Sequence, residues 1–200
     1  MNNDYLNFDW SPIINWESGG KNYYEKYLSH FTYPGGASGP TIMIGVDCAY
    51  YTETELKKIF NFLNETEINL VLGCIGETGL NAKSYIKKLK GIKVSWDNAE
   101  RVFYDIILPK FYNLTLKVWP KTEELCPSAQ VALTSIIFNR GSSLSGPSRI
   151  EMKNIKNLIL LKKYKEISEE IIKMKRLWIG KKLDGLLERR EEESKLVLSC

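Results

Sequence analysis

The sequence predicts an α+β protein that is mainly helical, with a small N-terminal lobe containing a short β element and a helical C-terminal lobe. A β-branched apolar stretch at 41–47 follows a Gly- and Pro-rich loop at 33–40, which is typical of a short strand. From about residue 81 onward, apolar residues recur at helical spacing. We therefore expect a single domain over 1–200, with an N-terminal lobe of about 1–80 and a helical lobe of about 81–200.

The N-terminal lobe begins with an irregular lead, and its helices can be assigned from local signals. We expect a first helix from about Ile13 to Leu28, since the preceding Pro12 is tolerated at a helix start. Thr52 with Glu55 has the pattern of a capping box and predicts a second helix, to about residue 63. Residues 66–78 are apolar with two Gly interruptions, which predicts a short buried helix and a bend.

Helix-capping residues, prolines and a glycine divide the helical lobe into separate helices. Ser95 starts a helix that Pro109 is expected to bend or end. Pro127 suits the first position of a helix that runs through Phe138, and Gly141 ends it.

A loop over 141–147 then leads to the last helices. Ser148 with Glu151 forms a second capping-box pattern. Two further helices are predicted at 165–178 and 183–197, separated by Gly180.

The net charge of +4 lies entirely in the last fifty residues. Residues 1–150 hold 15 basic and 15 acidic residues, whereas residues 151–200 hold 13 basic and 9 acidic ones. A mildly basic end favours association with a polyanion, although a solvated helical face has the same composition. Because no dense Arg/Lys block with interleaved aromatics occurs, we expect no nucleic-acid binding.

Cysteine and histidine usage argues against metal and cofactor chemistry. The four cysteines, Cys48, Cys74, Cys126 and Cys200, form no CxxC pair, so we expect no zinc site, no disulfide scaffold and reduced thiols. The single histidine, His30, excludes a His-based metal cluster and has no nucleophile-elbow motif beside it. We expect neither a metal nor an organic cofactor.

The sequence shows no targeting or membrane segment. No apolar run approaches the ~20 residues that cross a bilayer. The first residues are rich in Asn, Asp and Tyr and do not resemble a secretory signal. We expect a protein made in the cytoplasm, for which any outside substrate requires a separate delivery route.

Five tyrosines lie outside strict core spacing and have two interpretations. Flat apolar rings suit sugar faces, but aromatic residues in a helical run more often pack in the core, so we favour packing. The five are Tyr23, Tyr24, Tyr27, Tyr50 and Tyr51.

Two carboxylates and a threonine have the spacing that glycosidic bond cleavage requires. That reaction needs one carboxylic acid to protonate the leaving oxygen and one carboxylate to activate water or attack carbon. Glu17 lies within the first predicted helix, beside Trp16, whose ring could shield the carboxyl from water. Asp47 ends the predicted strand, and its even separation from Thr41 places both side chains on one face. By itself the pattern also fits a helix end at Glu17 and a turn former at Asp47.

The same residues resemble the active-site region of pesticin-like lysozymes, the bacterial-toxin relatives of phage lysozyme. That family shows a helical Glu, a tyrosine, a Pro-Gly loop and the motif S-G-x-T-I-x-x-G-x-D, and residues 38–47 here read SGPTIMIGVD. Residues 127–141, ending in Asn-Arg-Gly, resemble the family's core helix, and 185–193 resemble its closing segment with paired arginines. Pro40 and Cys48 depart from the family's usual residues.

The resemblance implies a lysozyme-like fold and an enzyme that cleaves the β-1,4 bond between N-acetylmuramic acid and N-acetylglucosamine in peptidoglycan. It assigns Glu17 as the general acid and Asp47 and Thr41 as the residues that activate and position water, with inversion of configuration. Such a protein would be a phage endolysin, a bacteriocin-like toxin or a secreted effector. It would act as a monomer in the periplasm or at the cell wall, after holin-type export or delivery by a secretion apparatus, and an effector would imply an immunity protein. The alternative is a cell-wall-binding or toxin-associated module on this fold that no longer cuts.

Two assignments stay open at this point. In the phage branch the second carboxylate follows the Glu by about nine residues, so Glu25 is a rival to Asp47, which we favour for its spacing from Thr41. Any of three arginines could hold the Glu17 carboxylate through a charge-assisted hydrogen bond, or could instead tie helices together. These arginines are Arg140, Arg189 and Arg190.

Overall fold

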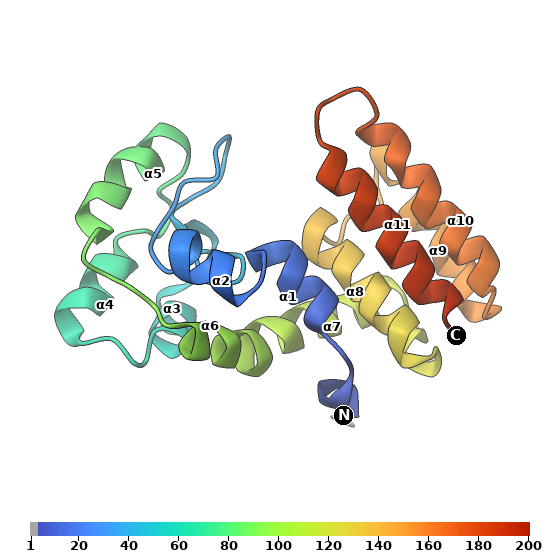
Figure 1. Ribbon diagram of the computed structural model, residues 1–200, viewed down its shortest axis with the longest axis horizontal. Coiled ribbons are helices and arrows are strands. Elements are labelled where there is room, and N and C mark those ends of the chain that lie inside the picture. The colour runs from blue at the N-terminus through green and yellow to red at the C-terminus, as the bar shows by residue number, and fades with distance from the viewer. Residues whose placement is uncertain (1–3) are drawn as a thin grey trace. The chain divides into compact units, whose positions relative to one another are not determined.

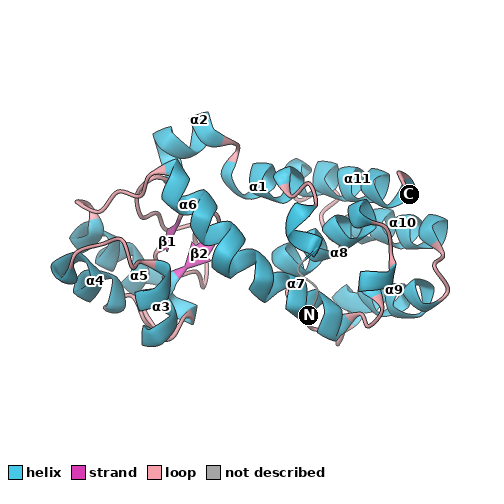
Figure 2. Cartoon of the chain, turned by 90° about the horizontal axis from the view of Figure 1, so that it is seen from below, coloured by secondary structure: helices cyan, strands magenta, loops and turns pink. Residues whose placement is uncertain are grey.

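The computed structural model describes residues 4–200 and is mainly helical, with one small antiparallel sheet (Figures 1 and 2). This confirms the mainly helical α+β class. The chain divides into two compact units. One consists of Ile14–Ile107, and the other combines Met1–Ile13 with Leu108–Cys200. The lobe boundary expected near residue 80 falls inside the first of these.

The unit Ile14–Ile107 contains the sheet, whose two strands lie among short helices (Figure 2). Its strands are β1 (Thr41–Ile42) and β2 (Val46–Asp47), and its helices are α2 (Lys21–Tyr23), α3 (Glu53–Ile59), α4 (Glu65–Leu72), α5 (Gly79–Tyr85) and α6 (Trp96–Val102). Single turns of 3-10 helix at Cys48–Tyr50 and Ile86–Leu89 and π-helical segments at Tyr24–Leu28 and Phe103–Ile107 complete it. The hairpin side chains Ile42 and Val46 are buried with Leu56, Ile59 and Phe60 of the α3 region.

The other unit is a helical bundle around one central helix. Its helices are α7 (Leu108–Val118), α8 (Pro127–Arg140), α9 (Ile150–Leu160), α10 (Tyr164–Lys173) and α11 (Asp184–Leu198), and α1 (Ser11–Ser18) contains the boundary between the units. Every residue of α8 from 129 to 137 is buried, since α7 and α11 both pack against it. The buried residues of α8 are mostly apolar, and they include the polar side chains of Gln130, Thr134 and Ser135.

The cap predictions that depend on local hydrogen bonds are confirmed at three helices. The hydroxyl of Thr52 accepts a hydrogen bond from the backbone N–H of Glu55, whose carboxylate accepts in return from the backbone of Thr52. The hydroxyl of Ser95 caps α6 by accepting a hydrogen bond from the backbone N–H of Asn98 at 3.3 Å. Pro127 occupies the start of α8, and Gly141, with φ of 73°, ends it.

Two predicted elements are wrong, because the backbone conformation differs from the periodic pattern. The helix expected from Ile13 to Leu28 breaks at Gly19 and Gly20, which adopt φ of 67° and 82°. The strand expected over 41–47 is a tight hairpin, since Met43 and Gly45 take positive φ and reverse the chain. The helix that starts after Ser95 changes to a π-helical segment at 103–107, and α7 then continues past Pro109.

The capping box expected at Ser148 is also wrong. Residues 147–149 form a 3-10 turn, and α9 begins at Ile150 with no side-chain cap. Glu151 is buried and instead accepts hydrogen bonds from the guanidinium of Arg176, with a distance of 3.1 Å between Nη2 and Oε2. A long-range ion pair therefore replaces the local cap.

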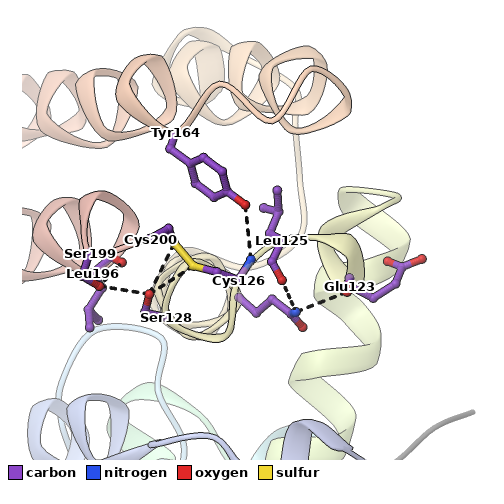
Figure 3. Close-up of a disulfide and its surroundings, with 9 residues drawn as sticks. Glu123, Leu125, Cys126, Ser128, Tyr164, Leu196, Ser199 and Cys200 are labelled. Atoms are coloured by element: carbon purple, nitrogen blue, oxygen red, sulfur yellow. Dashed lines mark hydrogen bonds between the residues drawn. A yellow bond between two sulfur atoms is a disulfide. The ribbon is translucent and has the colours of Figure 1, made fainter.

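The expectation of four reduced thiols is wrong for one pair. Cys126, before α8, and Cys200, after α11, form a disulfide with their Cα atoms 6.0 Å apart (Figure 3). The hydroxyl of Ser128 lies 3.2 and 3.4 Å from the two sulfur atoms. Cys48 and Cys74 remain buried thiols. The pairing joins residues 74 positions apart, so no local spacing in the sequence indicates it.

None of the helices in residues 4–200 combines the length and the apolarity that crossing a bilayer demands.

Candidate active site

Glu17 lies in the last turn of α1, at a point where the chain changes direction. The hydroxyl of Ser18 donates to the carbonyl of Ile14 at 2.6 Å, and the backbone N–H of Gly20 donates to the same hydroxyl at 3.2 Å. These bonds and the positive φ of Gly19 end the helix directly after Glu17. The Glu17 side chain is partly buried, as is Trp16 before it. The Glu17 carboxyl therefore lies at a helix end that the hydrogen bonds of Ser18 define, and it stays partly open to water.

Exposed aromatic rings lie close to this turn. Gly19 packs so closely on Tyr23 that a Cβ at position 19 would lie within 3.0 Å of the ring. Tyr23 and Tyr27 have their ring centroids 4.6 Å apart, and both are about half exposed. Tyr50 is also exposed, whereas Tyr24 and Tyr51 are buried. The packing interpretation therefore applies to two of the five tyrosines, and three present apolar faces that suit sugar rings.

Thr41 and Asp47 are directly opposite each other across the hairpin. The backbone N–H and C=O of Thr41 both bond to Thr32 on the other side, at 2.8 Å each. Thr41 and Asp47 therefore form a non-hydrogen-bonded pair, the type in which opposed Cα atoms approach to about 4.5 Å and side chains lie closest. The two side chains share one face, as expected, but because they are cross-strand partners and not because they alternate along one strand.

Two backbone N–H groups hold the Asp47 carboxylate through three hydrogen bonds. Gly39 donates to Oδ1 at 3.1 Å and to Oδ2 at 2.9 Å, and Ala49 donates to Oδ1 at 3.2 Å. A carboxylate has about four acceptor positions, so this arrangement fixes its orientation and leaves capacity for a further hydrogen bond on Oδ2. Asp47 is partly exposed and can therefore meet water.

Only glycine fits at position 39, because the backbone there lies directly against the Asp47 carboxylate. A Cβ on Gly39 would clash with the Cβ of Ala49 and with Oδ1 of Asp47. Sequence reasoning did not single out Gly39, although its place inside a Gly- and Pro-rich loop next to Thr41 is a signal that could have found it.

Tyrosine hydroxyls hold the rest of the loop. Tyr33 donates to the carbonyl of Gly36 and Tyr50 to that of Ala37, both at 2.7 Å. The N–H of Gly79 donates to the carbonyl of Ser38 at 3.1 Å and ties the loop to the start of α5. Next to this point, on α5 and the turn after it, lies an open depression of about 340 Å³ with a polar and aromatic lining. It is lined by Glu77, Asn81, Ser84, Tyr85 and Lys88.

Other sequence candidates have different surroundings. Glu25 is exposed on the π-helical segment Tyr24–Leu28. Burial raises the pKa of Cys48 well above its ordinary value, so this neighbour of Asp47 is a poor nucleophile. Among residues 4–200, no group of three His, Cys, Asp or Glu side chains could hold a metal ion.

The three candidate arginines belong to the other compact unit and have partners there. Arg189 and Arg190 donate to the buried carboxylate of Glu193, Arg190 at 2.7 Å. Arg189 also donates to the hydroxyl of Ser135 at 2.9 Å. Arg140 donates to the backbone carbonyl of residue 148. These contacts support the role of tying helices together.

Comparison with known proteins adds no assignment: no protein-family model matches the chain, and neither does any curated protein sequence.

Proposed function

We propose that this protein is a peptidoglycan muramidase, in which Glu17 is the general acid, Asp47 the general base and Thr41 a residue that orients the attacking water. The observation that carries the proposal is the pairing of Thr41 with an Asp47 carboxylate that two backbone N–H groups hold through three hydrogen bonds. A preorganised carboxylate of this kind costs no reorientation when the reaction begins.

The hydrogen bonds around Thr41 support a definite arrangement for the water. The Thr41 hydroxyl already donates its hydrogen to the carbonyl of Gly39 at 3.1 Å. Towards water, its oxygen therefore acts as an acceptor. A water that donates one hydrogen to Thr41 and the other to Asp47 keeps a lone pair free to attack the anomeric carbon.

The reaction balances with these groups alone. Protonated Glu17 gives its proton to the glycosidic oxygen as the bond to the anomeric carbon breaks. The water oxygen bonds to that carbon from the opposite face, and Asp47 takes the released proton. The product is a reducing sugar end of inverted configuration.

Exposed tyrosines support a glycan as the substrate. Tyr23 and Tyr27 project near the end of α1, and Tyr50 borders the loop that Asp47 holds. Aromatic faces contribute contact area to sugar rings at low cost in conformational entropy.

The disulfide supports a site of action outside a reducing cytoplasm. Disulfides persist in oxidising compartments such as the periplasm. We infer delivery to the cell wall by a holin-type or secretion route, with an immunity protein where the protein acts as an effector.

Release of reducing ends from purified peptidoglycan tests the proposal. We expect native protein to release soluble muropeptides with reducing N-acetylmuramic acid ends, identified by mass spectrometry, and Glu17→Gln to release none. Glu65→Gln, an exposed residue in the first turn of α4, is the matched control and should keep full activity. Equal activity in native protein and Glu17→Gln would remove Glu17 from the mechanism.

The exposed tyrosines also fit a second function, a cell-wall-binding module without turnover. Cosedimentation with insoluble peptidoglycan separates the two. Binding by well-folded native protein that releases no reducing ends would favour the binding module.

A further inference from the structure

The helical bundle has an open pocket of about 370 Å³ that plays no part in the proposed hydrolysis. It lies where the end of α8, the 3-10 turn at 147–149 and the segment after α10 meet, all within the unit that contains Leu108–Cys200. Its polar and aromatic lining comes from Asn139, Arg140, Ser148, Arg149, Trp178 and Lys181.

The charge of this pocket is one-sided. Arg140, Arg149 and Lys181 line it, and no acidic side chain does. Two buried acids of the same unit have other partners: Glu151 pairs with Arg176, and Glu193 pairs with Arg190. Glu151 offsets part of the charge on Arg140, but the lining itself holds three cations and no acid, so the pocket keeps a positive potential that attracts anions.

Arg140 carries a charge that its surroundings disfavour. Its Nη2 donates to the carbonyl of Ser148, but its Nη1 is buried without an acceptor in the part of the chain that the structure describes. Burial, together with repulsion from Arg149 and Arg190, lowers the pKa of Arg140 to about 10. A cation surrounded by other cations is stabilised by a bound anion.

Trp178 holds the guanidinium in place. The Cζ atom of Arg140 lies 5.2 Å from the Trp178 ring centroid, and that of Arg190 lies 5.6 Å from the same ring. Cation–π contacts of this kind fix the planar guanidinium and so preorganise a donor fork. The exposed hydroxyl of Ser148 and amide of Asn139 add uncharged donors at the same opening.

We propose that this pocket is a binding site for a small ligand bearing an oxyanion, either a phosphate or a carboxylate group. Arg140 and Arg149 provide guanidinium donors, and Lys181 closes the site with its ammonium group. Charge-assisted hydrogen bonds from guanidinium groups suit both kinds of oxyanion. The proposal stands independently of muramidase activity.

Titration with inorganic phosphate and with citrate tests the proposal without an activity readout. The indole N–H signal of Trp178, assigned in NMR spectra with Trp178→Phe, is followed at ionic strength held constant with sodium chloride. We expect a saturable shift, and weakening of the apparent affinity by about tenfold in Arg149→Gln and in Lys181→Gln, for one charge-assisted contact each. Tighter binding of phosphate or of citrate would identify which oxyanion the site prefers.

The controls separate a specific site from general screening. Lys117→Gln removes an exposed charge from α7 and should leave the affinity unchanged. The pocket variants avoid Arg140, whose replacement could disturb the end of α8. A shift that does not saturate, or that changes equally in Lys117→Gln and the pocket variants, would overturn the proposal.

Discussion

The Asp47 carboxylate combines a structural and a chemical task. It accepts hydrogen bonds from Gly39 and Ala49 and so holds the loop against the hairpin. The same bonds orient the oxygen that is proposed to take a proton from water. One residue therefore links the local fold to the proposed chemistry, and its variants affect both.

Replacing Asp47 by Asn should lower the rate of glycan hydrolysis by about 10²–10⁴-fold, because general-base assistance is lost. The side-chain NH2 group of the new Asn would also face a backbone N–H donor, which destabilises the loop. The free energy of unfolding should therefore be measured in urea beside the rate of hydrolysis. Glu25→Gln is the informative companion variant. If Asp47→Asn kept full activity and Glu25→Gln lost it, the base would be Glu25.

Gly39→Ala should destabilise the unit Ile14–Ile107 by about 1–3 kcal/mol, the usual cost of forcing an extra methyl into a packed site. The new Cβ would clash with Ala49 and displace the Asp47 carboxylate, so hydrolysis should fall as well. Gly91→Ala is the matched control, since a Cβ there meets nothing within 4 Å. Urea unfolding that finds both variants equally stable would contradict the assigned contact.

Helix α11 is anchored to α8 by a buried ionic group. Glu193 accepts from Arg189, Arg190 and the hydroxyl of Ser135, which donates at 2.6 Å. Two buried guanidinium groups share this one carboxylate, so its loss leaves buried positive charge without its acceptor.

Glu193→Gln should therefore lower the free energy of unfolding by about 3–5 kcal/mol, the typical cost of breaking a buried ion pair. Glu188→Gln, an exposed change on the same helix, should have little effect. Urea midpoints of the two variants, compared with native protein, measure the difference. Equal midpoints for both would mean that the buried ionic group contributes nothing to the anchoring of α11.

On the scale of the whole molecule, the disulfide closes a loop from the start of α8 to the end of α11 (Figure 3). It constrains the unfolded chain more than the folded one, because the two cysteines already meet in the bundle. A loop of this length corresponds to about 4 kcal/mol in the chain-entropy description.

Reduction with a thiol reagent should therefore lower the unfolding midpoint of native protein in urea. The double variant Cys126→Ser with Cys200→Ser should start from the lower midpoint and not respond to the reagent. A native midpoint that stays the same after complete reduction, checked by thiol titration, would contradict a stabilising role.

The sequence by itself determined the features that depend on neighbours in the chain. The mainly helical class, the capping box of Thr52 with Glu55, the start of α8 at Pro127 and its end at Gly141 were all predicted. Their hydrogen bonds and backbone angles involve residues within a few positions, so the pattern contains all the information. The shared face of Thr41 and Asp47 was predicted from alternation along one strand, but the hairpin produces it through cross-strand pairing.

Only the tertiary structure decided which distant groups meet. In the folded chain Cys126 forms a disulfide with Cys200, and Glu151 pairs with Arg176 and does not form a capping box with Ser148. The stretch expected to be one strand is a hairpin. The tertiary structure also placed Gly39 against Asp47, a contact that packing requires and periodicity cannot express. The physical reason is that such contacts depend on the packing of whole elements, whose free energy is not carried by any short stretch of sequence.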